Sequence, residues 1–412
     1  MENFQALLKD YVKLLVRVGL NVQQGQKVVV SAPVECAAIA RLAVREAYEA
    51  GAHDVYMRWI DDEVTRIRYD LAPDAAFDEF PEWQKLMLDS LSKEAAAFLS
   101  FSAADPELLL GVEPDKIMRQ QAVTRKALAD FQKRSMNNEV QWTVASIPTL
   151  KWAKKVFPNE ADAKAAVDKL WNAIFAASRV DGNDPAENWA KHKENLGKRA
   201  KKLNDYQFKA LKLKNAAGTD LELAMPENHK WMCAGERSRG GAEFLANIPT
   251  EEIFTAPHKD GANGRVVSTL PLVYNGNLIE DFVVEFKDGV VVNVSARTNE
   301  ELLKKLIANV ENANRLGEIA LVPYNSPISQ SKVLFYNTLY DENASCHLAF
   351  GKAYPSCLVD GENKSKEELE AAGLNDSLEH TDWMIGSADM SIVGICKDGT
   401  EIDVFVDGDF AF

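Results

Sequence analysis

Runs of apolar residues alternate with amphipathic segments along the first 145 residues of the chain. Apolar residues recur at helical spacing from Phe4 to Val18, which predicts an amphipathic helix. An apolar run predicts a buried strand at residues 27–31, and further strands are predicted at 54–60, 96–101 and 140–145. Helices are predicted between them at 35–50, 81–91 and 114–133. Because strands that alternate with helices build parallel sheets, this part of the chain is expected to form an open α/β layer.

The pattern changes after residues 149–205, a stretch rich in lysine, alanine and glutamate that is predicted to be helical. From Gln207 onward, short apolar runs follow one another. Hairpin turns between them are predicted at Asn263-Gly264, Asn275-Gly276, Asp288-Gly289 and Asp398-Gly399. One helix is expected at residues 302–316, opened by a capping box from Thr298 to Glu301. The sequence therefore predicts an α/β fold of two domains: an N-terminal open α/β domain with a helical extension (1–205) and a C-terminal, mostly antiparallel β domain (206–412).

The composition narrows the set of partners. Among 412 residues, 62 acidic and 47 basic side chains give a net charge of −15. This balance argues against a nucleic-acid-binding surface and favours the attraction of cations. No run approaches the roughly 18 apolar residues of a membrane span. Charged residues interrupt the N-terminal segment, so no signal peptide is expected. Five widely spaced cysteines without a CxxC pair fit a reducing cytoplasm.

Several common catalytic signatures are missing from the sequence. No GxGxxG follows the first predicted strand and no GxxxxGK[ST] is present, so a nucleotide site lacks its phosphate loop. The absence of HExxH excludes a zincin helix, and the absence of GxSxG argues against an α/β-hydrolase nucleophile elbow. Cys346 and His347 are adjacent and point apart on an extended chain, so they cannot themselves form a nucleophile–base pair.

Metal-ligating residue types gather between residues 342 and 382. His347, His380, Asp382 and nearby glutamates suit zinc, cobalt or manganese. On an extended chain His380 and Asp382 project to the same face, where they can hold one ion or two neighbouring ions. A lone histidine in an apolar setting, such as His347, is otherwise a core residue. If these side chains converge, they indicate a metal-dependent hydrolase.

Two further residues carry a chemical interpretation beside a structural one. Glu318 lies in an apolar run, where strand alternation places it on the face of Ala320 and Val322. A carboxylate there is either directed inward to a partner or a metal, or faces solvent at a strand edge. Near a metal, the Tyr354 hydroxyl would stabilise an oxyanion; otherwise the ring only packs.

Four motifs together resemble one family of enzymes. They are PTEEIFTAP (249–257), GEIALVP (317–323), YDENASCHLAFGKAY (340–354) and HTDWMIGS (380–387). In this order and with these flanks they resemble the aminopeptidase T/AmpS/PepS family of dinuclear metallo-aminopeptidases, and within it a streptococcal-type PepS. The resemblance covers essentially the whole chain, and it implies a dinuclear metal centre in the C-terminal domain.

The resemblance implies which residues form the site. The ligands carried over from the family are Glu252, Glu318, Glu342, His347, His380 and Asp382, and the matching active-site tyrosine is Tyr354. Family spacing selects Glu252 from the glutamate pair. For Glu251 a solvated surface position is expected, with a role as a proton shuttle behind the ligands as the alternative. Four carboxylates nearly neutralise two divalent cations, and carboxylates bridge two ions better than histidine, so Glu318 is the candidate bridge. Zinc, cobalt and manganese all accept this ligand mix.

The implied activity is removal of N-terminal amino acids from short peptides by a water that two metal ions activate. The family also implies a homodimer. Two alternatives stay open on the residues alone. One is a dinuclear hydrolase acting on phosphate or amide substrates, although Lys259 and Lys352 are the main cations near the ligand motifs. The other is a binding protein with a structural metal, although structural zinc sites prefer thiolates.

Overall fold

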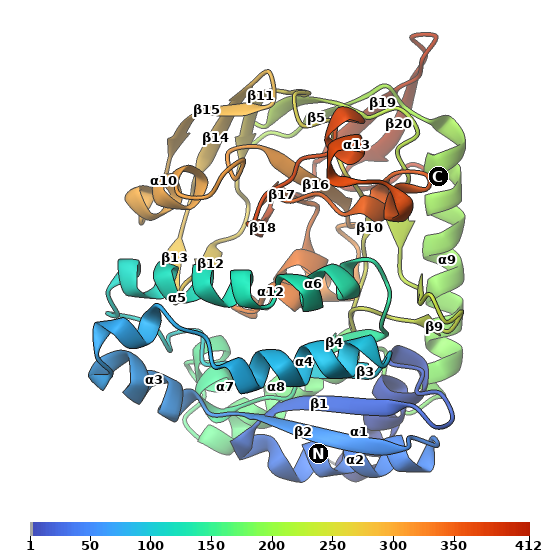
Figure 1. Ribbon diagram of the computed structural model, residues 1–412. Helices are drawn as coiled ribbons and strands as arrows, with labels where there is room; N and C mark the ends of the chain where they lie inside the picture. Colours follow the sequence, from blue (N-terminus) through green and yellow to red (C-terminus); the bar gives the residue numbers. More distant parts are fainter. Residues whose placement is uncertain (1–2) are drawn as a thin grey trace.

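A four-stranded parallel sheet forms the centre of the N-terminal half of the computed structural model, which describes residues 3–412 (Figure 1). The strands are β1 (Lys27–Pro33), β2 (Asp54–Ile60), β3 (Ala97–Phe101) and β4 (Trp142–Ala145). Their order is β2-β1-β3-β4, with Val28 of β1 opposite both Val55 and Ala97. All three pairings are parallel, which confirms the predicted open α/β layer.

Helices cover both faces of this sheet, which explains why β1 is a continuous apolar run. The helices are α1 (Phe4–Lys13, continued by a π-helical turn, Leu14–Gly19), α2 (Ala37–Glu49), α3 (Asp62–Leu71), α4 (Glu82–Lys93), α5 (Pro114–Ala127) and α6 (Ala129–Met136). Val28 and Val30 pack into the core that α1 and α2 share, whereas Val29 packs on the other face against Leu88 of α4. A strand buried on both faces has apolar residues at successive positions, without the alternation of polar and apolar residues seen in a half-exposed strand.

Two helical details of this half differ from the sequence prediction. The helix expected at 114–133 is two helices, α5 and α6, which meet at Leu128. Helix α3 was not predicted. It begins at an N-cap, where the Asp61 side chain accepts a hydrogen bond from the Val64 amide at 3.0 Å. The apolar stripe of this helix is too weak to stand out in the sequence.

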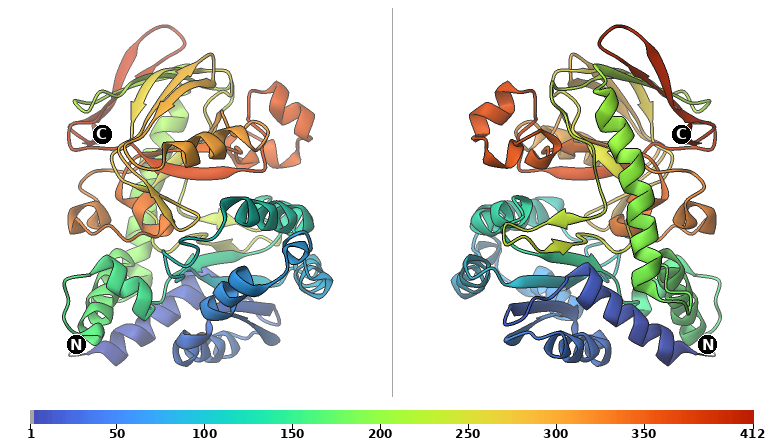
Figure 2. Two further views of the ribbon diagram at one scale, coloured as in Figure 1. Left: turned by 90° about the vertical axis from the view of Figure 1, so that its left-hand side faces the viewer. Right: turned by 90° about the vertical axis from the view of Figure 1, so that its right-hand side faces the viewer.

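Three helices follow the sheet, as predicted for residues 149–205, and the last one joins the two halves. They are α7 (Leu150–Val156), α8 (Ala163–Ala177) and α9 (Pro185–Tyr206). Helix α9 runs along both halves (Figure 2). Trp189, near its start, belongs to the N-terminal core, whereas Leu196 and Leu203 belong to the C-terminal core. The proposed boundary near residue 205 stays a prediction and falls at the end of this shared helix.

The C-terminal half contains two antiparallel sheets, which confirms its predicted class. The larger sheet has the order β15-β14-β11-β6-β5-β19-β20-β21 and the smaller one β18-β17-β16-β10-β7. The strands of the larger sheet are β5 (Ala210–Lys214), β6 (Asp220–Ala224), β11 (Ala262–Val267), β14 (Val283–Lys287), β15 (Val290–Ser295), β19 (Ser391–Ile395), β20 (Glu401–Val406) and β21 (Asp409–Phe410). Those of the smaller sheet are β7 (Met232–Cys233), β10 (Ile253–Thr255), β16 (Leu316–Leu321), β17 (His347–Gly351) and β18 (His380–Met384). One core lies between them.

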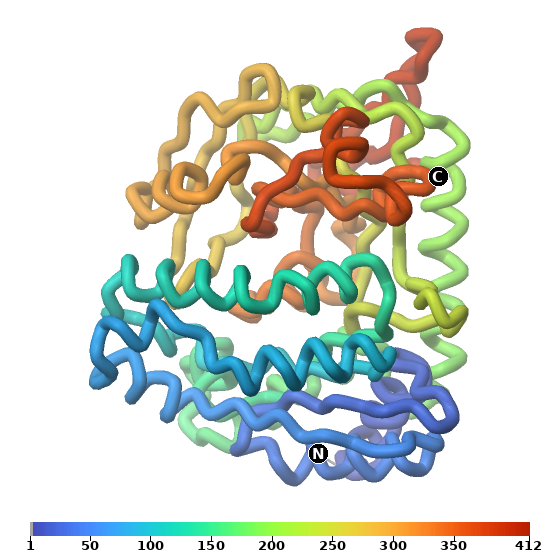
Figure 3. Tube along the Cα trace, in the orientation of Figure 1, coloured from blue at the N-terminus to red at the C-terminus, as the bar shows by residue number. Residues whose placement is uncertain are grey.

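Two small hairpins extend from this half. They are β8 (Glu236–Arg237) with β9 (Glu243–Phe244), and β12 (Leu272–Tyr274) with β13 (Asn277–Ile279). Figure 3 shows the chain after α9 passing down to the N-terminal half and back. On that path Asn247 forms a bridge with Val144 of β4. The two halves therefore meet where β8 and β9 approach the parallel sheet.

Three of the four predicted hairpin turns are confirmed. Asn275-Gly276, Asp288-Gly289 and Asp398-Gly399 each lie between paired antiparallel strands. The prediction at Asn263-Gly264 is wrong, because both residues lie inside β11. Gly264 has a φ of +125°, and a Cβ atom there would lie 2.2 Å from the Asp220 carbonyl oxygen. This glycine permits close strand contact instead of a turn.

The helix predicted at 302–316 is shorter, and its capping box is wrong. Helix α10 (Glu300–Ala308) begins after Asn299, which has left-handed backbone geometry and no side-chain cap. Thr298 instead donates its hydroxyl hydrogen bond to Glu280 at 2.9 Å. Three short helices were not predicted: α11 (Pro327–Ser331), α12 (Thr338–Asp341) and α13 (Lys366–Ala371). Within residues 3–412, no helix combines the length and apolar character needed to cross a bilayer.

Candidate metal centre

Strand register brings the predicted ligands to one face of the five-stranded sheet. In β16, β17 and β18, Glu318 is opposite Ala349, and Ala349 is opposite Asp382. Opposite residues share a face, and so do residues two apart on one strand. His347 therefore lies on the face of Ala349, and His380 on the face of Asp382. The four side chains form one patch although they come from three strands.

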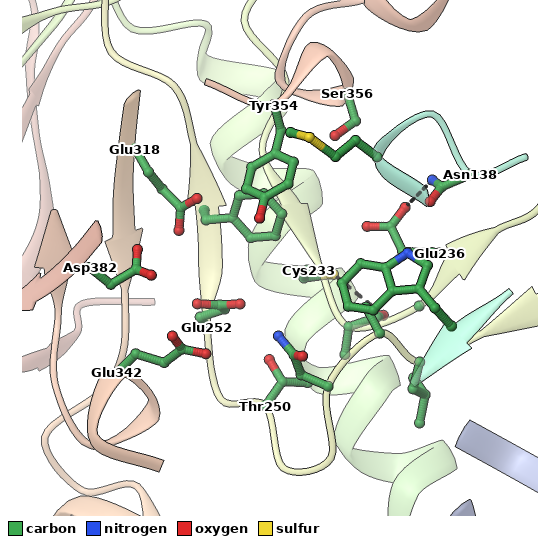
Figure 4. A pocket seen from close by; sticks show the side chains of 18 of the residues that line it. Asn138, Cys233, Glu236, Thr250, Glu252, Glu318, Glu342, Tyr354, Ser356 and Asp382 are labelled. Carbon is green, nitrogen blue, oxygen red and sulfur yellow. Dashed lines mark hydrogen bonds between the residues drawn. The ribbon is translucent and has the colours of Figure 1, made fainter. Parts of the chain in front are cut away.

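Two more carboxylates approach this patch from neighbouring elements. Glu252 immediately precedes β10, whose Ile253 is opposite Leu321, so alternation turns Glu252 to the face of Glu318. Glu342 opens a 3-10 turn between α12 and β17. Figure 4 shows Glu252, Glu318, Glu342 and Asp382 directed toward a common space.

The ligand atoms lie close enough to share cations. His347 Nε2 lies 3.2 Å from Glu252 Oε2 and 3.5 Å from Glu318 Oε1. His380 Nε2 lies 3.3 Å from Asp382 Oδ1 and 3.7 Å from Glu318 Oε2. Two groups of three ligands result, Glu252–Glu318–His347 and Glu318–His380–Asp382. Glu318 belongs to both groups, one oxygen toward each histidine, as a bridging carboxylate requires.

Backbone carbonyls fix the orientation of both imidazole rings. His347 Nδ1 donates to the Ser345 carbonyl at 3.1 Å, and His380 Nδ1 donates to the Lys352 carbonyl at 2.7 Å. These bonds leave each Nε2 directed at the carboxylates. A histidine that ligates a metal through Nε2 ordinarily donates its other ring hydrogen to such an acceptor. No sequence pattern identifies these acceptors, since any residue supplies a carbonyl.

The cluster contains four carboxyl groups, and the neighbouring side chains do not supply enough positive charge to balance them. Burial, followed by the charges of Asp382 and Glu252, raises the pKa of Glu342 well above its usual range. Burial also raises the pKa of Glu318. Burial alone would lower the pKa of His347, but its hydrogen bonds to Glu252 and Glu318 hold that pKa well above its usual range. Glu318, Glu342 and His347 therefore favour their protonated forms when no other cation is present.

These features fit divalent metal ions. Asp382 Oδ1 is buried and accepts no well-directed hydrogen bond. Among residues 3–412, no lysine or arginine nitrogen comes within 4 Å of the carboxylates of Glu252, Glu318, Glu342 or Asp382. Buried carboxylates without such partners are costly unless they coordinate a cation. Oxygen-rich sets with two imidazoles suit zinc, cobalt or manganese.

Comparison with known proteins decides the family. The model of the family described as thermophilic metalloprotease (M29) matches residues 4–410. The chain belongs to the M29 metalloprotease family. Membership makes it a metallopeptidase, and the expected family resemblance is confirmed.

Relatives of this M29 chain match over nearly their full length. Aminopeptidase AmpS of Bacillus subtilis is 45% identical over 412 residues, 100% of each chain. Aminopeptidase PepS of Streptococcus thermophilus is also 45% identical, over 100% of this chain and 99% of its own. The solved structure of wild-type AmpT from Thermus thermophilus has a TM-score of 0.92 at 36% identity, with 99% of this chain and 100% of that chain covered.

Tyr354 of the M29 chain borders the ligand cluster. Its ring packs edge-on against His380, with 5.1 Å between ring centroids, and against Phe254. Burial, then the charges of Glu318 and Asp382, raises the pKa of Tyr354 well above its usual range. The hydroxyl therefore stays protonated and can act as a hydrogen-bond donor.

The surface position expected for Glu251 is wrong. Its side chain is 3% exposed and forms a two-oxygen contact with Arg179 Nη2 at 2.7 and 2.8 Å. His192 Nε2 lies 2.8 Å from the carbonyl of the preceding residue, Thr250. Alternation turns Glu251 away from the cluster, but Arg179, which follows α8, and His192 of α9 cover that side, which the local sequence cannot show. The pair anchors the segment that presents Glu252.

Replacement of Arg179 by methionine is expected to destabilise this M29 chain by about 3–5 kcal/mol, because it leaves Glu251 buried without its cation. Denaturant unfolding measures the effect. The double variant Arg179→Met/Glu251→Gln should recover a large part of the loss. Lys191→Met, which removes an exposed ion pair, is the matched control and should change nothing measurable. A loss for Arg179→Met as small as that control would contradict the anchoring role.

A cavity of about 130 Å3 extends from the cluster toward the N-terminal half. Besides the predicted site residues it is lined by side chains that sequence reasoning missed, among them Asn138, Trp142, Glu236 and Phe254. Trp142 lies in β4, and the sequence around it predicts a strand but no role in a site. Such residues become identifiable only when the two halves are placed together.

Proposed function

We propose that this chain is a metal-dependent aminopeptidase that releases N-terminal amino acids from short peptides. The observation that carries the proposal is the pair of three-ligand groups that share Glu318 on one sheet face. The M29 family membership and relatives named as aminopeptidases support the same activity. The small volume of the adjoining cavity suits a single side chain of a peptide end, not a folded protein.

The residues that would hold the ions are Glu252, Glu318, Glu342, His347, His380 and Asp382, and Glu318 belongs to both three-ligand groups. Two divalent ions held there would supply an activated water molecule and would polarise the scissile carbonyl group. The chain's own contribution is to hold these oxygen and nitrogen atoms in place. The Ser345 and Lys352 carbonyls orient the imidazoles, and the Arg179–Glu251 pair orients the segment of Glu252.

We assign Tyr354 the role of donating a hydrogen bond to the oxyanion that develops on the scissile carbonyl. A protonated phenol beside the ligands is suited to this role, since a donor fixed in advance stabilises charge that appears only in the transition state. The packing of its ring against His380 and Phe254 fixes the direction of the hydroxyl.

Tyr354→Phe is therefore expected to lower kcat by about 10- to 100-fold while changing KM less, because only the transition state carries the charge that the hydroxyl meets. Steady-state kinetics on leucine p-nitroanilide measure both constants. Bound metal, quantified by mass spectrometry, should stay at the parent level. A change confined to KM would count against the oxyanion role.

The finer assignments belong to the same proposal. The metals are zinc, cobalt or manganese, which this donor set does not separate. A cytoplasmic location is consistent with five cysteines that are all free. A homodimer is proposed from the family, and a solution mass of one chain would contradict it.

The activity is tested with a panel of aminoacyl p-nitroanilides, offered to chelated protein with and without added Co²⁺, Mn²⁺ or Zn²⁺. We expect metal-restored cleavage of substrates with a free amino group and none of their N-acetylated forms. Cleavage of acetylated substrates would exclude an aminopeptidase.

Two observations weigh against the alternative functions. A phosphohydrolase needs cations that clamp phosphate oxygens, yet no lysine or arginine among residues 3–412 pairs with the ligand carboxylates, and Lys352 faces Asp376 at 3.5 Å. A structural zinc site uses a closed shell, often of thiolates, whereas these ligands are carboxylates and imidazoles beside an open cavity. If chelation abolished folding instead of activity alone, the structural reading would be favoured.

A further inference from the structure

The cavity beside the candidate metal centre contains an acidic side chain that the proposed chemistry does not use. Glu236, at the start of β8, lines the same cavity as Glu252 and Tyr354. In Figure 4 it lies on the opposite side of the cavity from Glu318 and Asp382. A carboxylate there cannot join the ligand set, but it faces whatever side chain a peptide's first residue extends across the cavity.

Glu236 is held in position but not neutralised. Asn138 Nδ2 donates to Glu236 Oε2 at 2.7 Å, and Asn138 itself is 7% exposed. Within residues 3–412, no lysine, arginine or histidine nitrogen lies within 4 Å of this carboxylate. Burial raises the pKa of Glu236, against the opposing effect of the hydrogen bond from Asn138. A largely buried carboxylate with no cationic partner is costly, and a cationic ligand group removes that cost.

Part of the cavity wall is apolar. Met136, Trp142, Leu245 and Phe254 all line the cavity. A ligand that fits this profile has an amino end, a chain of methylene groups and a cationic tip. Long basic side chains bury their methylene groups against apolar surface while the charged end meets a polar partner. Aromatic rings such as that of Trp142 add a cation–π contribution.

We propose that Glu236 is a specificity-determining residue for peptides that begin with arginine or lysine. The guanidinium or ammonium group of the first side chain pairs with Glu236, while the α-amino group and scissile bond lie at the opposite, ligand-bearing end of the cavity. Asn138 is a positioning residue that fixes the carboxylate. This inference rests on the proposed aminopeptidase function.

The test compares p-nitroanilides of arginine, of its neutral isostere citrulline, and of leucine, in metal-supplemented protein. The parent is expected to favour arginine over citrulline by about 10- to 100-fold in kcat/KM, which is the value of one charge-assisted hydrogen bond. In Glu236→Gln this ratio should fall to about one, mainly through KM for the arginine substrate. Leucine turnover should be largely unchanged, which shows that the variant is folded and active.

The matched control is Glu362→Gln, which removes a neighbouring carboxylate whose charge reaches Glu236 but whose side chain does not line the cavity. It should keep the parent's ratio of arginine to citrulline. A parent ratio near one, or an unchanged ratio in Glu236→Gln, would overturn the proposal. If the parent cleaved none of the three substrates with any metal, the aminopeptidase function itself would be overturned, which is a separate result.

Discussion

Replacement of Glu318 by glutamine is expected to lower kcat by more than about 100-fold and to reduce the bound metal. Loss of an outer hydrogen-bond partner of a metal ligand already costs about 10- to 100-fold, so loss of the carboxylate proposed as a ligand in both groups should cost more. Glu318 reaches toward both histidines, with Oε1 3.5 Å from His347 Nε2 and Oε2 3.7 Å from His380 Nε2. No other residue belongs to both ligand groups.

A readout besides activity separates this role from a purely structural one. In the parent, added metal should raise the unfolding temperature, because a ligand that binds only the folded state stabilises it. Glu318→Gln should shrink that rise, and His380→Ala should do the same. The control Glu222→Gln changes an exposed glutamate on β6 and should keep both turnover and the metal-induced rise. Full turnover of Glu318→Gln with the parent's metal content would refute the assignment.

Local physics accounts for the parts of the fold that the sequence predicts. The run from Lys27 to Ser31 is apolar on both faces because helices cover both sides of β1, so its pattern alone identifies a buried parallel strand. Asn275-Gly276 and Asp288-Gly289 supply the backbone conformation of tight turns, and both close hairpins. At Asn263-Gly264 the same dipeptide serves close strand contact, a constraint imposed by a neighbouring strand and invisible locally.

Local sequence patterns are also insufficient to predict which residues of the site meet, because these residues come from separate strands. The i and i+2 spacing of His380 and Asp382 identifies their shared face, since one strand contains both. That Glu318 meets them depends on the order β18-β17-β16, which no local pattern encodes; only the resemblance of motifs to a known family assembled the set. Glu251 was assigned to the surface because Arg179, its partner, is 72 residues away in the chain.

The free energy of unfolding of the metal-free protein and the stabilisation added by bound metal are expected to change with pH in opposite directions. We expect the free energy of unfolding of the chelated protein to fall as pH rises from about 6.5 to about 10. The part contributed by bound metal should instead grow with pH, because histidine and carboxylate ligands must lose their protons before they bind a metal.

The free energy of unfolding of the metal-free protein falls with rising pH because the folded state raises the pKa values of the histidines. Burial lowers the pKa of His380, but the charge of Asp382, 3.3 Å from the imidazole, and the charge of Glu318 raise it to about 10. A histidine whose pKa is raised in the folded state stabilises it fully below its unfolded pKa of about 6.5, and this contribution disappears as pH rises through the folded value. The pKa values of His347 and Glu342 are also raised, so these two groups likewise lower the free energy of unfolding as pH rises. Asp382, whose pKa is lowered, is ionised in both states across this window and adds no slope.

Denaturant unfolding at a series of pH values, with chelator or with saturating metal, measures both slopes. One pKa unit corresponds to about 1.4 kcal/mol, so His380 alone should account for a metal-free loss of about 3–5 kcal/mol across the window. His380→Ala should flatten that slope, whereas His53→Gln, at an exposed position distant in sequence, should leave it unchanged. Parallel curves with and without metal would mean that protons and metal ions do not compete for these side chains. The cluster would then not be the metal centre, whatever the activity of the enzyme.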